Sequence, residues 1–336
     1  MQNRIVNRLC FFLAAVFFLS FSASSCMADA SAPPEKIVLY TALTASTPQI
    51  PLWAAIREGW PAGYTLQVEY WKNLDDLRGV MLAGKGDIWV GNLEGFAQAA
   101  KRGAPVTLIA VTGWKKFYFV TSAGENITSF EEMVDVLKKT GKPLAVTPQD
   151  GPALGVLEAI GKKTGIDFNV APMPPQQLML EMIRGTRSCA LIPEPLLSSL
   201  LAKKGDIRIV ASLEETYARE FGGQARLPLA GIAVNTAFAK AHPEMIRKLL
   251  QTMRDAVPRL GARPESAIAV LPKAVREALG DHVLKASLSR DLIYIESADE
   301  AQERVAAFLK MMLPALKDSP AKHDGMPSSS FILPGL

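Results

Sequence analysis

The sequence predicts an α/β fold built from two similar lobes, and three observations support this prediction. The chain has 336 residues, which suggests two domains at about 150 residues per domain. β-rich segments alternate with helical segments, a pattern typical of sheets that are covered by helices. The same order of segments then returns roughly 100 residues later along the chain.

The composition excludes several other classes of protein. Hydrophobic residues make up 49% of the chain and charged residues 21%, which is ample for packed cores and excludes a disordered chain. With 3 Cys, the chain is not a disulfide scaffold. The net charge of +4 and the lack of a dense Lys/Arg run argue against nucleic-acid binding.

The first of the two repeated units begins with a strand at 37–42. The segments after it are a helix at 48–58, a strand at 64–71, a helix at 74–83, a strand at 87–90, a helix at 94–102 and a strand at 106–111. The helix at 74–83 carries Leu74, Leu77 and Met81 on one face, and Gly84 ends it. The run at 106–111 is apolar or nearly so, as expected of a buried strand.

The second unit repeats this order. Segments 142–147, 153–164, 178–184, 190–192 and 207–211 correspond to 36–41, 48–58, 77–83, 88–90 and 106–110. Gly185 follows its helix as Gly84 does, and Gly205 follows two basic residues as Gly103 does. Any two α/β segments share an outline, but the matching glycines favour a duplicated unit.

The remaining segments predict a hinge and a helical cover. The second unit is flanked by a β-rich run at 117–122 and a strand-like stretch at 227–235. The segments that follow are helices at 243–257, 264–279 and 298–316 and a short strand at 292–296. We therefore expect lobe one to comprise 35–124 and 226–316, with lobe two, 125–225, inserted into it. Crossovers near 122–124 and 222–228 would form a hinge for closure around a ligand. The Pro/Ser-rich residues 317–336 are expected to form a loose tail.

The first thirty residues have the features of an export signal. Arg4 and Arg8 precede an uncharged apolar run at 9–19, and Ala28-Asp29-Ala30 has the small-residue pattern of a cleavage site. The apolar run is shorter than the roughly 20 residues that a membrane-spanning helix needs. We expect residues 1–30 to be a signal peptide that is cleaved after Ala30.

A second interpretation of this segment is lipid attachment. Ala23-Ser24-Ser25-Cys26 resembles the box at which bacterial lipoproteins receive lipid, although Leu is usual where Ala23 stands. Cys26 would then anchor the mature chain to a membrane. Cys189 lies in an apolar, strand-like stretch and is expected to be an inert buried thiol.

The candidate ligand-binding residues are chosen from the predicted strand ends. In open α/β sheets, ligands bind beyond the carboxyl ends of the strands. The first strands of the two lobes end at Thr41 and Thr147, and each is followed by a polar loop that leads into a helix. Backbone N–H groups at such helix starts favour an anionic group. The loop residues expected to contact the ligand are Ser46, Thr47, Gln149, Asp150 and Gly151.

Three further residues occupy related places. Asn92 and Glu194 end the third strands of the two lobes, and Trp114 follows another strand end, where it would form an aromatic wall. The alternatives are that Ser46, Thr47 and Asp150 only cap helices, that Asn92 and Glu194 bond to neighbouring loop amides, and that Trp114 packs in the core. A carboxylate at Asp150 would suit an amine or a heterocyclic N–H in the ligand.

The sequence contains no catalytic or metal-binding pattern. It has neither Gly-x-Ser-x-Gly nor His-Glu-x-x-His, and Gly84-Lys85-Gly86 lacks the third glycine of a dinucleotide loop. The three histidines, His242, His282 and His323, lie apart from one another and from Cys or acidic pairs. We therefore expect no enzyme activity, no cofactor and no metal.

Three segments form a recognisable series: 86–105, Glu194-Pro195 after a strand, and 234–243 before a long helix. Together with the export signal and the repeat, they resemble the periplasmic solute-binding proteins of ABC importers over about 35–315, in the nitrate/sulfonate/taurine/thiamine-precursor branch. The resemblance implies the type II periplasmic-binding-protein architecture, in which two Rossmann-like lobes are joined by a two-crossover hinge.

The chain departs from this family at three places. Gly91-Asn92-Leu93 stands where a Ser- or Thr-bearing loop is common, Asp150-Gly151-Pro152 where Gly-Ser or Gly-Thr is common, and Cys189-Ala190 where Asp-Ala is common. The ligand therefore stays open among a sulfonate, nitrate, a thiamine-precursor-like compound and another small nitrogenous solute.

The resemblance implies a monomeric periplasmic protein that captures a small polar or anionic solute. It would deliver the solute to an ABC permease in the inner membrane and would have no nucleic-acid partner. Two alternatives are an enzyme on the same fold, related to pyrimidine synthases, and an exported ligand-sensing module. Turnover by the purified protein would favour the enzyme, and a neighbouring kinase gene would favour the sensor.

Overall fold

The computed structural model describes residues 34–44, 47–312 and 331–332. The expected signal peptide, Cys26, Ser46 and almost all of the 317–336 tail lie outside the described residues. The chain divides between Glu35 and Lys36 into two units. Both sheets belong to the second unit, apart from Glu35 itself, which is the first residue of the first strand.

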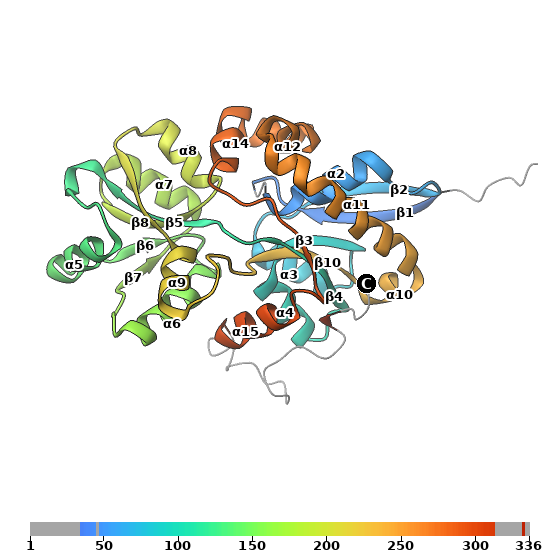
Figure 1. Cartoon of the computed structure of the whole chain (residues 1–336), viewed down its shortest axis with the longest axis horizontal. Coiled ribbons are helices and arrows are strands. Elements are labelled where there is room, and N and C mark those ends of the chain that lie inside the picture. Colours follow the sequence, from blue (N-terminus) through green and yellow to red (C-terminus); the bar gives the residue numbers. More distant parts are fainter. Residues whose placement is uncertain (1–33, 45–46, 313–330, 333–336) are drawn as a thin grey trace, which may run out of the picture. The chain divides into compact units, whose positions relative to one another are not determined.

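The first sheet has the strand order β11-β4-β10-β3-β1-β2 (Figure 1). Its strands are β1 (Glu35–Thr41), β2 (Tyr64–Tyr70), β3 (Ile88–Asn92), β4 (Val106–Gly113), β10 (Ala230–Asn235) and β11 (Glu296–Ser297). β1 and β3 are parallel, whereas β10 runs antiparallel to both β3 and β4, and β11 runs antiparallel to β4. We call this sheet and its helices lobe one.

The second sheet has the strand order β7-β6-β8-β5-β9. Its strands are β5 (Phe117–Ser122), β6 (Leu144–Val146), β7 (Val170–Pro172), β8 (Cys189–Pro193) and β9 (Ile207–Ser212). β6 is parallel to β7 and β8, and β5 runs antiparallel to both β8 and β9. We call this sheet and its helices lobe two.

The strand orders confirm that the two units are repeats. Read along the sheet, β4-β10-β3-β1-β2 in lobe one corresponds to β9-β5-β8-β6-β7 in lobe two. In each lobe the antiparallel strand lies between the third and fourth strands of the repeat. The predicted α/β class is confirmed, with sheets that are mixed because of this inserted strand.

Strand β5 is placed differently from the prediction. The sequence put 117–122 in lobe one, but the strand pairs with β8 and β9 and so belongs to the second sheet. The chain therefore passes from the first sheet to the second at 114–116, before this strand, and returns through 222–229. The reason is that an apolar run of this length carries no information about which sheet offers it partners.

Helices cover both faces of each sheet (Figure 1). On one face of the first sheet lie α2 (Ile50–Gly59), α10 (Thr236–Ala241), α11 (Pro243–Ala262), α12 (Pro264–Val270), α13 (Lys273–Leu279) and α14 (Asp281–Leu288), and on the other α3 (Leu74–Leu82), α4 (Leu93–Lys101) and α15 (Gln302–Met312). On the second sheet, α7 (Pro175–Arg184) and α8 (Leu196–Lys203) cover one face, and α5 (Phe130–Thr140), α6 (Ala153–Thr164) and α9 (Leu213–Phe221) cover the other. The predicted helix at 264–279 is two helices, because Leu271-Pro272 interrupts it, and α14 was not predicted.

Local signals set several of these helix ends. The side chains of Asn73, Ser129 and Ser212 accept hydrogen bonds from the backbone N–H three residues later and so cap α3, α5 and α9. Gly165 and Gly185 follow α6 and α7 with φ of 73°, a left-handed backbone that suits glycine. These caps place the helices so that their apolar faces meet the sheets.

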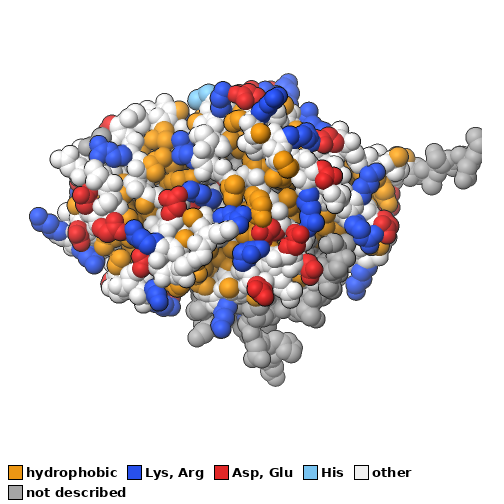
Figure 2. Space-filling model, viewed as in Figure 1, with side chains coloured by type: hydrophobic (Ala, Val, Ile, Leu, Met, Phe, Trp, Pro, Cys, Tyr) orange, Lys and Arg blue, Asp and Glu red, His pale blue; other side chains and the backbone are white. Residues whose placement is uncertain are grey.

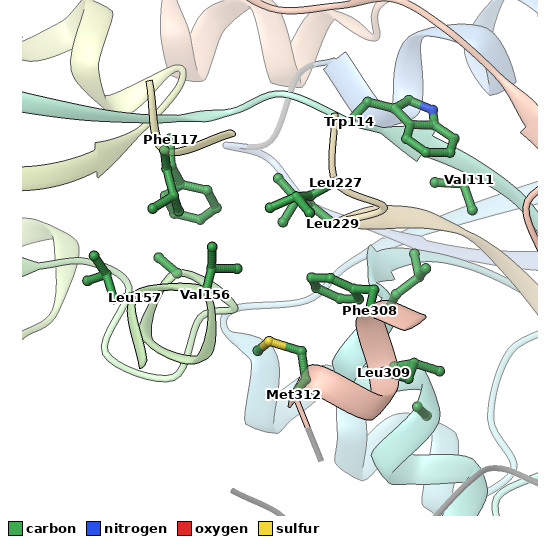
Figure 3. Close-up of a cluster of buried hydrophobic side chains, with 14 of the residues drawn as sticks. Val111, Trp114, Phe117, Val156, Leu157, Leu227, Leu229, Phe308, Leu309 and Met312 are labelled. Atoms are coloured by element: carbon green, nitrogen blue, oxygen red, sulfur yellow. The ribbon is translucent and has the colours of Figure 1, made fainter. Parts of the chain in front are cut away.

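One hydrophobic cluster joins the two sheets. It contains Trp89 and Leu108 of the first sheet together with Phe119 and Leu144 of the second. Figure 3 shows Leu227 and Leu229 in the middle of this cluster, with Phe117 on one side and Phe308 of α15 on the other. The other labelled side chains of the cluster are Val111, Trp114, Val156, Leu157, Leu309 and Met312. The seam between the lobes is therefore packed with apolar side chains on this side.

The surface of the described residues carries both signs of charge. On the face in Figure 2, Lys and Arg side chains are interspersed with Asp and Glu side chains. Among the described residues, none of the helices is long and apolar enough to span a membrane.

Strand β10 tests the packing of the first sheet. A Cβ atom at Gly231 would lie well inside van der Waals distance of the Ala110 carbonyl oxygen and 3.2 Å from Leu93 Cδ1. We expect Gly231→Ala to lower the free energy of unfolding by about 2 kcal/mol or more, because the clash involves backbone. Urea unfolding measures this loss. The control is Gly59→Ala at the end of α2, where a Cβ meets nothing within 4 Å. An equal loss in both variants would contradict the packing described.

Candidate functional site

The carboxyl ends of β4 and β8, one strand from each sheet, lie at the crossovers. The backbone N–H of Glu194, at the end of β8, donates to the Lys116 carbonyl at 2.9 Å. On the segment through which the chain returns to β10, the N–H of Leu227 donates to the Trp114 carbonyl at 2.8 Å, and the N–H of Leu229 donates to the Gly113 carbonyl at 2.9 Å. The ends of β4 and β8 therefore lie against the crossovers.

The loop after β1 is held by its own side chains. The Thr41 hydroxyl donates to Gln49 Oε1 at 2.9 Å, and Gln49 Nε2 donates to the Ala42 carbonyl at 3.0 Å. The Thr112 hydroxyl donates to the Pro48 carbonyl at 2.7 Å and so fixes the short helix η1 (Thr47–Gln49) on the end of β4. The Thr41 hydroxyl thus stabilises the loop, and the loop places Thr47 at the contact between the two lobes.

The loop after β6 forms a tight turn at the start of α6. The Gly151 N–H donates to the Pro148 carbonyl at 3.0 Å, and a Cβ at Gly151 would lie 2.9 Å from Pro148 Cγ. Thr147 is fully buried, whereas Gln149 and Asp150 are exposed. Glycine at 151 thus allows the turn that presents Asp150.

Asn92 and Glu194 occupy equivalent places but have different surroundings. The Asn92 amide oxygen lies over the first turn of α4, 2.6 Å from where a Gly95 Cβ would stand, and makes no hydrogen bond within the described residues. Both carboxylate oxygens of Glu194 are bonded: Oε2 accepts from the Ser198 N–H at 3.0 Å, and Oε1 from Arg290 Nε at 2.7 Å. Glu194 therefore makes the internal bonds that the sequence analysis left open, and a ligand contact there stays a prediction.

Several predicted residues share an unsatisfied polar group. Within the described residues, Thr47 Oγ1, Asn92 Oδ1, Trp114 Nε1 and Thr147 Oγ1 are buried and lack hydrogen-bond partners, and the same holds for Glu94 Oε2. A buried polar group left without a partner costs about 1–3 kcal/mol, so native proteins rarely leave several at one place. Two others, Ser122 and Ser287, lie elsewhere in the fold. The concentration of such groups at the strand ends points to a bound molecule that would satisfy them.

Trp114 lies in a pocket of aromatic and cationic groups. Its ring meets Tyr294 edge-on with centroids 5.8 Å apart, and the guanidinium groups of Arg226 and Arg304 lie 5.7 and 5.8 Å from its centroid. The side chain is fully buried (Figure 3). The structure therefore shows the core-packing alternative for its ring, while its N–H remains without a partner among the described residues.

A charged cluster on the seam was missed by the sequence analysis. Half-buried Lys116 and Asp291 lie close to Glu194, and Arg290 binds Glu194 and, at 2.5 Å, the Ser198 hydroxyl. Glu214 accepts from the N–H groups of Lys116 and Phe117 at 2.8 and 3.1 Å. In the sequence, the Lys115-Lys116 pair next to Trp114 was the one feature that could have indicated this charged cluster. Arg290 and Asp291 could not be assigned to it, because they follow a helix that the sequence did not predict.

The electrostatics of this cluster arise from its burial. Loss of solvent raises the pKa of Asp291 to about 7, although the Thr47 hydroxyl and the Lys116 ammonium stabilise its charged form. The Thr47 hydroxyl lies near this carboxyl without reaching good hydrogen-bond geometry. Burial lowers the pKa of Lys116, an effect that Asp291, Glu194 and Glu214 oppose. The seam thus holds ionisable groups of both signs.

A cavity of about 840 Å³ opens between α4 and α6. Lobe one contributes Arg78, Glu94 and Gln98, and lobe two contributes Asp150, Gly151 and Leu154, with Met312 of α15 also in its wall. Its size is in the range of small-molecule sites. Of the predicted residues the cavity brings together Asp150 and Gly151, whereas Thr41, Thr47, Asn92, Trp114, Thr147, Gln149 and Glu194 are not in its wall.

Asp291 makes the stability of the free protein depend on pH. Because its pKa is raised from 3.8 to about 7, the folded state binds more protons than the unfolded state between these values. Stability therefore falls as pH rises through this range, by on the order of 2 kcal/mol for a half-buried group. Asp291→Asn should remove this part of the dependence, as measured by urea unfolding from about pH 4 to about pH 7. Asp167→Asn, at an exposed carboxyl, is the control; wild-type and Asp291→Asn curves that run parallel would refute the assignment.

Comparison with solved structures supports the fold. An ABC transporter protein from Parabacteroides distasonis is 18% identical, with 90% of this chain and 99% of that chain covered and a TM-score of 0.67. The periplasmic aliphatic sulphonate binding protein of Escherichia coli is 15% identical, with 90% and 95% covered and a TM-score of 0.67. The periplasmic nitrate-binding protein of Synechocystis is 14% identical, with 86% and 83% covered and a TM-score of 0.61. The chain thus has the type II periplasmic-binding-protein architecture.

A search of curated proteins returned no match. The model of the family described as NMT1/THI5 like matches residues 46–267, a stretch that contains β2 to β10, both crossovers and every predicted ligand residue except Thr41. With most of the chain matched and the fold in agreement, this protein belongs to the NMT1/THI5 like family.

Proposed function

We propose that this protein is the extracytoplasmic solute-binding component of an ABC importer. The observation that carries the proposal is the set of buried, unsatisfied polar groups at the strand ends where two duplicated lobes meet. A small polar solute between the lobes would satisfy these groups. Because it would contact both lobes, it would favour the closed arrangement over an open one.

The similar structures agree with this function. They include proteins described as periplasmic binding proteins for sulfonates and for nitrate, and a ligand-binding component of an ABC-type import system from Staphylococcus aureus. Family membership and these relatives favour a binding protein over the related enzyme. The partners would be a small solute and a membrane permease, with the protein acting as a monomer.

The proposed ligand contacts differ in their support. Thr147 and Trp114 are best supported, because each is fully buried with a polar group that no described residue satisfies. Thr47 and Asn92 come next, and Asp150 and Gly151 line the cavity. For Thr41, Ser46, Gln149 and Glu194 the proposal rests on their position at the strand ends.

We also propose that the two sheets act as separate lobes around a hinge. The hinge would consist of 114–116 and 222–229, since these segments connect strands of different sheets. Glu214 would hold one hinge segment through its bonds to Lys116 and Phe117. Closure would turn α6 and α4 toward each other across the cavity.

A thermal-shift screen followed by calorimetry tests the binding site. The screen covers sulfonates, nitrate, pyrimidines and amines, since a true ligand raises the melting temperature. Thr147→Val should weaken binding of the identified ligand at least about fivefold. The same change should leave the free protein as stable or about 1 kcal/mol more stable, because it removes an unsatisfied buried hydroxyl.

Thr216→Val is the matched control for this variant. The Thr216 hydroxyl is also buried, but it donates to the Ser212 carbonyl at 2.9 Å and so is satisfied within the first turn of α9. This variant should lose some stability and keep full affinity. A Thr147→Val protein with unchanged affinity, or one that is clearly destabilised, would remove Thr147 from the site.

We propose that the chain is exported to the periplasm with removal of residues 1–30. Intact-mass analysis of the protein from the periplasmic fraction of a bacterial host should find a chain that begins at Ser31. A chain that begins at a lipid-modified Cys26 would establish the lipoprotein alternative instead. Retention of Met1 would contradict both forms of the proposal.

A further inference from the structure

We infer that the cavity between α4 and α6 selects a solute with a cationic nitrogen, which Glu94 of lobe one and Asp150 of lobe two would bind together. The inference rests on the proposed function and specifies the chemistry of its ligand. It also sets this chain apart from similar structures that are described as binding sulfonate or nitrate.

Glu94 presents an unused carboxylate oxygen. Its Oε1 accepts from Gln98 Nε2 at 2.9 Å, whereas its Oε2 is buried and has no partner among the described residues. The nearest cation in the cavity wall, Arg78, does not reach it directly. Arg78 donates to Gln98 Oε1 at 2.7 Å and pairs with Asp75 on its own helix. The free oxygen is therefore available to a donor from outside the chain.

Asp150 presents a second unused carboxylate on the other lobe. It lies in the turn before α6, lines the same cavity, and makes no hydrogen bond or ion pair with any described residue. Burial raises the pKa of Glu94 to about 6, although the Arg78 charge and the Gln98 hydrogen bond oppose this rise, and the negative charge of Asp150 adds a smaller increase. The two carboxyls thus repel each other across the cavity.

The Arg78 charge stabilises ionised Glu94 by more than Asp150 destabilises it, but within the described residues neither Arg78 nor Lys162 bonds to Glu94 Oε2 or to Asp150. Lys162 pairs with Glu158 at 2.5 Å on α6, and Asp167 adds another carboxylate to the wall. Glu94 and Asp150 thus line one cavity from opposite lobes, and within the described residues neither carboxyl forms an ion pair. An anionic solute would add to the repulsion, whereas an ammonium or amidinium group between them would remove it and draw the lobes together.

Binding of such a cation should depend on pH in a defined direction. The charged form of Glu94 is the one that attracts the cation, and its pKa of about 6 lies within the accessible range. Affinity should therefore rise as pH increases through about 6. The charged groups that face Glu94 across this cavity are Arg78 of α3, Asp150, and Glu158, Lys162 and Asp167 on and beyond α6.

Calorimetry with small cationic and anionic probes tests the inference on the purified mature protein. The cationic probes are 1,4-diaminobutane and agmatine, and the anionic probes are butane-1-sulfonate and nitrate. We expect the cations to bind at least about tenfold more tightly than the anions, and more tightly near pH 8 than near pH 5. Glu94→Gln and Asp150→Asn should each weaken cation binding at least about fivefold. Glu277→Gln, at an exposed carboxyl of α13 that pairs with Lys273 at 3.4 Å and lies outside the cavity, should change affinity less than about twofold.

The remaining outcomes would contradict this inference alone or the proposed function as well. Binding of the anions alone would overturn this inference and leave the proposed function intact. Binding of the cations with equal affinity in wild type, Glu94→Gln and Asp150→Asn would also overturn it, because the carboxyls would not be the contacts. Failure of both classes, together with a negative wider screen, would contradict the proposed function as well. Melting temperatures of the unliganded variants establish that they are folded.

Discussion

The exchange of strands between the two sheets is the constraint on which the rest of the structure depends. β10 lies between β3 and β4 in the first sheet, and β5 lies between β8 and β9 in the second. The chain reaches each of these strands by crossing from the other sheet, so neither sheet is complete without a crossover. The crossovers must therefore lie against the strand ends, and backbone hydrogen bonds from Leu227, Leu229 and Glu194 fasten them there.

This arrangement divides the seam into parts with different chemistry. Apolar side chains of Leu227, Phe117 and Phe308 fill one part, where burial stabilises the contact between the sheets. Another part holds half-buried Lys116 and Asp291, whose pKa values are shifted, and the Arg290–Glu194 pair, whose charges satisfy each other. The unsatisfied groups of Thr147 and Trp114 belong to neither of these internally complete parts. Under the proposed function, Thr147 and Trp114 contact the solute, whereas the other two parts stabilise the fold.

Duplication of the fold did not duplicate the chemistry. Asn92 and Glu194 end equivalent strands, yet the first leaves an oxygen without a partner among the described residues and the second is bonded through both oxygens. The partner that makes this difference, Arg290, comes from a segment after α14 that has no counterpart in the repeat. Equivalent position therefore predicts where a side chain lies, but not what it contacts.

The sequence by itself determined the two repeated units and placed the strand ends at or next to Thr41, Thr147, Asn92 and Glu194, because periodicity and helix-ending glycines act over a few neighbouring residues. The family was indicated separately, by a resemblance in particular segments such as 86–105. Only the tertiary structure decided that β5 joins the second sheet, that Glu194 pairs with Arg290, and that Glu94 and Asp150 line the same cavity. These facts depend on segments far apart in the chain. A single sequence records no signal for such pairings, since hydrogen bonding and charge compensation are settled by whichever groups the packed sheets bring together.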